Sequence, residues 1–259
     1  MKTLFMTLAI IGSVLAARAQ VHTETVEYKD GDTVLEGYLA YDDSTAKGPR
    51  PAVLVVHQWT GLGDYEKKRA EMLAKLGYVV FAADIYGKGV RAKDTTEAGA
   101  LAGKYRNGDR TLLRERANAA LAVLEKNERT DTKRVAAIGY CFGGTTVLEL
   151  ARSGADIAGV VSFHGGLDSP KPADGKNIKC PVLVCHGADD PFEKPEDLTA
   201  FENEMRDAKV DWRLIKYGGA VHAFTQPDPG FSNPGARYNE KADKRSWADM
   251  KMFFAEIFQ

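Results

Sequence analysis

Short, nearly continuous apolar runs recur along the chain. Five of them are rich in β-branched residues: Val53–Val56, Val79–Ala82, Val135–Ile138, Val160–Phe163 and Val182–Cys185. Such runs are typical of parallel strands that are covered by helices on both faces. A last strand is expected over Asp211–Tyr217.

Two earlier segments alternate apolar and polar residues instead. These are Thr25–Tyr28 and Leu35–Tyr41, with Asp30-Gly31-Asp32 between them. They predict an antiparallel hairpin at the edge of the sheet. Helical segments are expected between and after the later strands, beginning near Asp64, Asp109, Gly143, Pro195 and Asn239. This alternation predicts an α/β fold with a mostly parallel, doubly wound sheet and helices on both faces.

The composition narrows the class of protein. The 259 residues include 35 basic and 36 acidic ones, which gives a formal net charge of −1, and 44% are hydrophobic. A nucleic-acid-binding protein usually has a basic excess, so no nucleic-acid partner is expected. The apolar content also excludes a disordered chain. A globular domain that acts on a small molecule fits these values.

The first 19 residues have the features of a secretory signal peptide. Lys2 precedes the mostly apolar segment Thr3–Leu15, and Ala17-Arg18-Ala19 is a typical cleavage site. The apolar segment is too short to span a bilayer as a helix. We therefore expect residues 1–19 to be removed and residues 20–259 to form a single domain, exported to the periplasm or secreted, without membrane association. An amphipathic or anchoring N-terminus is the alternative.

A strand-to-helix turn carries the candidate nucleophile. In parallel sheets, ligands bind beyond the carboxyl ends of the strands. Gly139-Tyr140-Cys141-Phe142-Gly143-Gly144 follows one of the predicted strands and has the G-x-C-x-G layout of a nucleophile elbow. The following helix dipole favours a thiolate, and the Phe142 N–H is a candidate oxyanion donor. The alternative is a buried cysteine in an ordinary turn.

Two further strand ends carry the other members of a catalytic triad. Asp189 and Asp190 follow the strand that ends at Cys185, and His222 lies on a glycine-rich loop after the last strand. The order nucleophile, acid, histidine is that of α/β-hydrolases. The predicted triad is therefore Cys141, Asp190 and His222, with Asp189 as the alternative acid.

The loop after the first parallel strand is expected to complete the oxyanion hole. His57-Gln58-Trp59-Thr60-Gly61 follows Val53–Val56, and its second donor is expected from the backbone of Gln58 or Trp59. The histidines at other strand ends, His57, His164 and His186, lack a metal-binding spacing. They are interpreted as hydrogen-bonded groups near the site, and no metal is expected.

These motifs together give a family resemblance. From residue 20 onward the chain resembles the dienelactone hydrolase family, which has the α/β-hydrolase fold. The segments that carry the resemblance are His57–Leu62, Asp84–Gly87, Gly139–Gly144, Gly187–Asp190 and Ala220–Phe224. The resemblance implies a Cys-Asp-His triad at the same three residues. Cysteine is the more specific marker, since most α/β-hydrolases have serine at the elbow.

The chain departs from the family pattern at two positions. The family has a glutamate that helps to activate the thiol where this chain has Gln58, and an arginine for the substrate carboxylate near Gln226. Candidate contacts at the substrate rim are Arg91, Tyr105, Arg106 and Arg237. Their alternative is an ordinary surface role.

The predicted function is hydrolysis of small carboxylic esters or lactones through a thiol ester intermediate. A nucleophile, a base and an oxyanion hole suffice for this reaction, so no metal or organic cofactor is expected. A second hypothesis is a catalytically weak or inactive protein that binds a small molecule or senses redox state through its thiol. Gln58 in place of glutamate motivates this alternative.

Overall fold

Eight strands form one sheet in this computed structural model, which describes residues 20–44, 47–228 and 233–259. They are β1 (His22–Asp30), β2 (Thr33–Tyr41), β3 (Arg50–Val56), β4 (Val79–Ala83), β5 (Thr130–Tyr140), β6 (Gly159–Phe163), β7 (Val182–Gly187) and β8 (Trp212–Tyr217). Their spatial order is β1-β2-β4-β3-β5-β6-β7-β8. The β1–β2 and β2–β4 pairs are antiparallel, and the remaining pairs are parallel. The predicted mostly parallel sheet and its N-terminal hairpin are confirmed.

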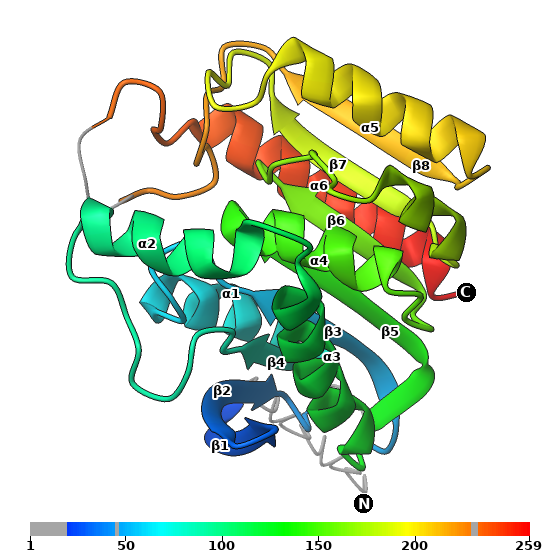
Figure 1. The fold of residues 1–259 in the computed structure, drawn as a ribbon. Coiled ribbons are helices and arrows are strands. Elements are labelled where there is room, and N and C mark those ends of the chain that lie inside the picture. The colour runs from blue at the N-terminus through cyan, green and yellow to red at the C-terminus, as the bar shows by residue number, and fades with distance from the viewer. Residues whose placement is uncertain (1–19, 45–46, 229–232) are drawn as a thin grey trace, which may run out of the picture.

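Helices cover both faces of the sheet (Figure 1). On one face lie α1 (Asp64–Ala74) and α6 (Glu240–Ile257), and on the other lie α3 (Thr111–Lys126), α4 (Phe142–Arg152) and α5 (Pro195–Asp207). The helix α2 (Thr95–Arg106) packs near α3, and the 3₁₀ helix η1 (Pro172–Asn177) lies beside α5. None of the helices in the described ranges is both long and apolar enough to cross a membrane.

Because helices cover both faces of the sheet, the strands are continuous apolar runs in the sequence. Successive side chains of a strand point to opposite faces. In β3, Leu54 and Val56 enter the core beneath α3 and α4, whereas Val53 and Val55 enter the core beneath α1 and α6. All four side chains are fully buried.

The helix α2 was not expected from the hydrophobic pattern. Only Ala98 and Tyr105 are buried along it, so it lacks a long apolar stripe. Its start does carry a local signal, because the Asp94 carboxylate accepts a hydrogen bond from the backbone N–H of Glu97 at 2.9 Å. The N-cap, rather than the periodicity, identifies this helix.

The carboxyl ends of five strands meet at one edge of the sheet. The residues that follow them are His57 after β3, Cys141 after β5, His164 after β6, Asp190 after β7 and His222 after β8. Segments that are distant in sequence are therefore brought together where ligands bind in such sheets. The proposed signal peptide, residues 1–19, lies outside the described residues.

Candidate active site

The turn between β5 and α4 is sharp and strained at its central residue. Cys141 has φ 54° and ψ −114°, a conformation that costs a non-glycine residue energy. A Cβ atom on Gly139 would lie 1.9 Å from the carbonyl oxygen of Gly143. A Cβ atom on Gly143 would lie 2.2 Å from the carbonyl oxygen of Val56. The two glycines therefore allow the close backbone packing that lifts Cys141 above the sheet.

Cys141, His222 and Asp190 form a continuous hydrogen-bonded row. Nε2 of His222 lies 3.0 Å from Sγ of Cys141, and its Nδ1 lies 2.8 Å from Oδ2 of Asp190. The other carboxylate oxygen of Asp190 accepts the backbone N–H of Phe192 at 2.9 Å. The carboxylate that reaches the histidine is therefore that of Asp190, whereas Asp189 is exposed.

The electrostatics of the row favour a thiolate beside an imidazolium. Burial alone would raise the pKa of the Cys141 thiol, but the charge and hydrogen bond of His222, with the Phe142 N–H and Arg106, lower it overall. Burial alone would lower the pKa of His222, but the Cys141 sulfur and the Asp190 carboxylate raise it to about 10. Each partner therefore stabilises the charged form of the other.

The two candidate second donors of the oxyanion hole differ in their contacts. The backbone N–H of Gln58 donates to Oε1 of Glu66 at 3.3 Å, and that of Gly63 donates to Oε2 at 2.9 Å. Both Gln58 and Trp59 line the same cavity as Cys141, but Gln58 directs its N–H at a buried carboxylate. Sequence reasoning missed Glu66, although its position three residues after Gly63 is a capping-box spacing.

A cavity of about 270 Å³ opens over the Cys141 sulfur. Its walls are mostly apolar and include Phe142, Phe192 and Ala223, while Arg106 is a charged side chain in its lining. The Arg106 guanidinium is paired with Asp168 at 2.6 Å. The cavity therefore suits a small substrate with an apolar part.

The other three candidate rim residues lie elsewhere. Tyr105 is 2% exposed and donates its hydroxyl to the carbonyl of Tyr86 at 3.0 Å, so it lies in the hydrophobic core and not at the rim. Arg237 is exposed, and its backbone N–H donates to the carbonyl of His222. Arg91 lines a neighbouring pocket.

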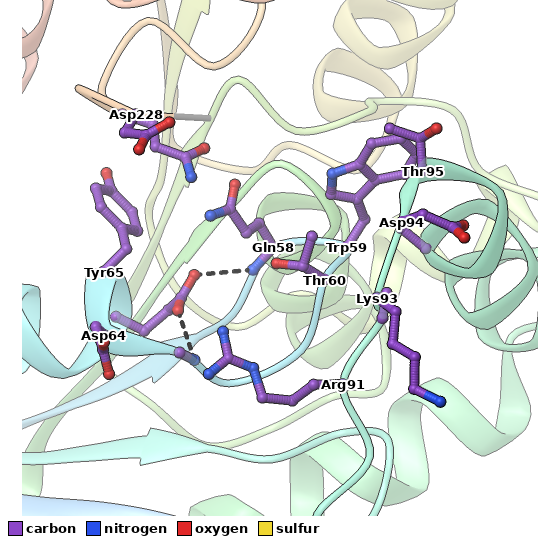
Figure 2. A pocket seen from close by; sticks show the side chains of 15 residues that line it. Gln58, Trp59, Thr60, Asp64, Tyr65, Arg91, Lys93, Asp94, Thr95 and Asp228 are labelled. Atoms are coloured by element: carbon purple, nitrogen blue, oxygen red, sulfur yellow. Dashed lines mark hydrogen bonds between the residues drawn. The ribbon is translucent and has the colours of Figure 1, made fainter. Parts of the chain in front are cut away.

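That neighbouring pocket, of about 420 Å³, is polar and adjoins the first cavity (Figure 2). The two share Gln58, Trp59 and Gln226 as lining residues. In Figure 2 the Gln58 side chain lies between Tyr65 and Trp59. The position at which the family has a glutamate is therefore on the wall between an apolar and a polar space.

Of the three histidines at other strand ends, His57 and His164 have the predicted hydrogen bonds. The prediction is wrong for His186, whose buried Nδ1 has no hydrogen-bond partner among the described residues. His57 is buried, with Nε2 accepting the N–H of Ile85 at 3.1 Å and Nδ1 lying 2.6 Å from the carbonyl of Gln58. His164 and His186 are also buried. Within the described ranges no cluster of three or more His, Cys, Asp or Glu residues could hold a metal ion. The three cysteines are all free thiols.

Comparisons with known proteins agree with this architecture. The model of the dienelactone hydrolase family matches residues 35–258. A relative from Bradyrhizobium sp., named probable 2-oxo-3-(5-oxofuran-2-ylidene)propanoate lactonase, is 31% identical over 215 residues, which cover 78% of this chain and 86% of the relative.

Two solved structures are similar over nearly the whole chain. The dienelactone hydrolase-like promiscuous phosphotriesterase P91, from metagenomic libraries, is 42% identical with a TM-score of 0.87, covering 92% of this chain and 99% of P91. The dienelactone hydrolase of Anabaena variabilis is 20% identical with a TM-score of 0.67, and the match covers 93% of this chain and 100% of that one. This likeness shows that the two chains share the fold.

Proposed function

Because this chain belongs to the dienelactone hydrolase family, we propose that it hydrolyses small carboxylic esters or lactones with Cys141 as nucleophile. The observation that carries the proposal is the row of contacts from Cys141 through His222 to Asp190, at 3.0 and 2.8 Å. A nucleophile within hydrogen-bond reach of a base, itself oriented by a carboxylate, is the arrangement that acyl transfer requires. The apolar cavity over the sulfur supports a small, partly apolar substrate.

In the acylation half, the Cys141 thiolate attacks the carbonyl carbon of the ester. A carbon–sulfur bond forms, and the carbonyl oxygen becomes an oxyanion that accepts hydrogen bonds from the backbone of Phe142 and, in this proposal, Trp59. Trp59 is preferred because the N–H of Gln58 is used by Glu66. The carbon–oxygen bond then breaks, and the His222 imidazolium protonates the departing alkoxide.

In the deacylation half, neutral His222 takes a proton from a water molecule that attacks the thiol ester. The carboxylic acid leaves and the sulfur returns as thiolate beside the imidazolium. Asp190 holds Nδ1 of His222 throughout, which keeps Nε2 directed at the sulfur and the water. These side chains supply every step, so the mechanism includes no metal or organic cofactor.

The test compares turnover of p-nitrophenyl esters and small lactones by the purified wild type, Cys141→Ala and His222→Ala. We expect turnover by the wild type and losses of several orders of magnitude in both variants. Full activity of Cys141→Ala would refute the nucleophile assignment. Ligand binding without turnover by the wild type would favour a non-catalytic binding or redox-sensing protein instead.

We also propose that residues 1–19 direct export and that residues 20–259 form the mature domain. The proposal rests on the short positive start, the apolar segment and the small residues Ala17 and Ala19. N-terminal sequencing of the protein recovered from a bacterial periplasm or culture medium should begin at Gln20. Retention of Met1 on a cytoplasmic protein would contradict it.

A further inference from the structure

His164 contacts the backbone of the candidate nucleophile from below. It follows β6 in a left-handed conformation, φ 40°, which is unusual for a residue other than glycine. Its Nδ1 lies 3.2 Å from the backbone nitrogen of Cys141, whose N–H also donates to the carbonyl of Phe163 at 3.0 Å. Because a backbone N–H can only donate, Nδ1 is an acceptor and the ring proton of neutral His164 is on Nε2.

The other ring nitrogen of His164 reaches the loop that carries His222. Nε2 lies 2.8 Å from Oγ1 of Thr225, three residues after His222. The rings of His164 and His222 also pack edge to face, with centroids 5.2 Å apart. The elbow and the histidine loop are thus joined twice: through Cys141 and His222 themselves, and through His164 and Thr225 beneath them.

Thr225 is fixed from its other side. Its Oγ1 lies 2.7 Å from the hydroxyl of Tyr65 in α1, and its carbonyl accepts a hydrogen bond from Arg69 at 2.7 Å. Arg69 is paired in turn with Asp243 of α6 at 2.5 Å. Thr225 is fully buried, so these contacts occur without competition from solvent.

His164 must remain neutral for these contacts to hold. Protonation would place an N–H on Nδ1 opposite the N–H of Cys141. Burial holds the pKa of His164 well below its usual range, and the positive charge of the nearby His222 lowers it further. The neutral ring is therefore compatible with a charged His222 at the same time.

We propose that His164 and Thr225 are positioning residues that set the distance between Cys141 Sγ and His222 Nε2. The inference rests on the proposed function, because that distance matters only if the two side chains react together. The geometry needed by acyl transfer is narrow, and a displacement of about 1 Å can cost on the order of 100-fold in rate. Neither residue touches the substrate in this proposal.

The test replaces Thr225 by valine and by serine. Thr225→Val keeps the shape but leaves the His164 N–H without an acceptor, whereas Thr225→Ser retains the hydroxyl. For Thr225→Val we expect kcat for a p-nitrophenyl ester to fall by roughly 10-fold or more, with KM changed less than about threefold. Thr225→Ser should recover most of the lost kcat.

The second readout is the pH dependence of Cys141 alkylation by iodoacetamide. In Thr225→Val the thiol pKa should rise, because the His222 imidazolium no longer sits within hydrogen-bond reach of the sulfur. Thr130→Val is the matched control, since Thr130 is buried at the start of β5, distant from the site, and its hydroxyl has no partner among the described residues. A purely structural role would lower the melting temperature without moving this profile.

A second variant covers the case in which Thr225→Val does not fold. His164→Asn suits the left-handed backbone but is too short to join Cys141 to Thr225, so it should shift the alkylation profile in the same direction. Unchanged kcat and alkylation profile in either folded variant would overturn the inference. That outcome leaves the proposed function intact if wild-type turnover still depends on Cys141, so the two failures are distinguishable.

Discussion

The backbone N–H of Gln58 points at the carboxylate of Glu66, 3.3 Å away. The same carboxylate accepts the N–H of Gly63, and it is 1% exposed. One buried side chain therefore fixes both ends of the loop 58–63, which carries the proposed second oxyanion donor. Burial raises the pKa of Glu66, and the backbone donors oppose that rise.

Replacement of Glu66 should impair catalysis more than binding. In Glu66→Gln one of the two backbone donors faces an amide NH₂ group, so the loop shifts and kcat should fall by roughly 10-fold with little change in KM. Glu71→Gln on the same helix is the control, because Glu71 contacts Tyr38 and not this loop. Equal kcat values for the two variants would show that Glu66 does not set the loop.

The two adjacent aspartates should behave differently on substitution. Asp190→Asn removes the carboxylate that orients Nδ1 of His222 and should lower kcat by about 10³-fold to 10⁴-fold. Asp189→Asn alters an exposed side chain and should leave kcat/KM close to the wild-type value. Steady-state hydrolysis of one ester by both variants measures the contrast, and the reverse result would assign the acid to Asp189.

The rate should depend on pH in a bell shape. The Cys141 thiol has a lowered pKa, so the thiolate forms, and kcat/KM rises, below the pH at which a free thiol ionises, about 8.5. His222 has its pKa raised to about 10, so the imidazolium that would protonate the leaving group in the proposed mechanism is lost, and the rate should fall, as the pH passes that value. If kcat/KM instead showed only one rise, near the pKa of an ordinary thiol, the ion pair between Cys141 and His222 would be contradicted.

The elbow should reject even one added methyl group. Gly143→Ala would place its Cβ against the carbonyl oxygen of Val56, so we expect a loss of more than about 2 kcal/mol of folding free energy. Gly99→Ala is the control: nothing lies within 4 Å of its Cβ in α2, and a gain of up to about 1 kcal/mol is expected. Urea denaturation measures the stability of both variants. Similar midpoints would show that the Val56 carbonyl does not crowd a side chain at position 143.

An exposed aromatic ring should influence substrate choice. Phe192 is 54% exposed, lines the cavity over Cys141 and packs edge to face on His222 at 5.4 Å. Phe192→Ala should raise KM for p-nitrophenyl hexanoate by roughly 10-fold through lost apolar contact, with a smaller effect on the acetate. Met252→Ala, a similarly exposed residue on α6, is the control. Equal changes of KM for the two esters would show that the acyl chain does not contact Phe192.

The sheet, and the meeting of Cys141, Asp190 and His222 at its edge, were predictable because they depend on local patterns at strand ends. Apolar runs mark strands that are buried on both faces, and the ends of such strands converge whatever lies between them. Asp189 and Asp190 are adjacent in one turn, so the sequence alone separates them poorly. In the structure the carboxylate of Asp190 reaches His222.

The supporting contacts were less accessible to sequence reasoning. His164 and Thr225 lie 61 residues apart, and nothing local relates a histidine after one strand to a threonine on another loop. Tyr105 has the polar tip of a rim residue, yet helix α2 turns it inward to Tyr86. Such roles follow from tertiary placement, which short-range periodicity does not encode.

The carboxyl edge of the sheet gathers its reactive groups from loops after β3, β5, β6, β7 and β8. No single segment holds the site, so it exists only once five strands separated by up to about two-thirds of the chain have paired in register. Recovery of esterase activity during refolding would therefore report the completion of these long-range pairings. We expect it to lag behind helix formation, since closure of long loops is the slow part of folding such sheets.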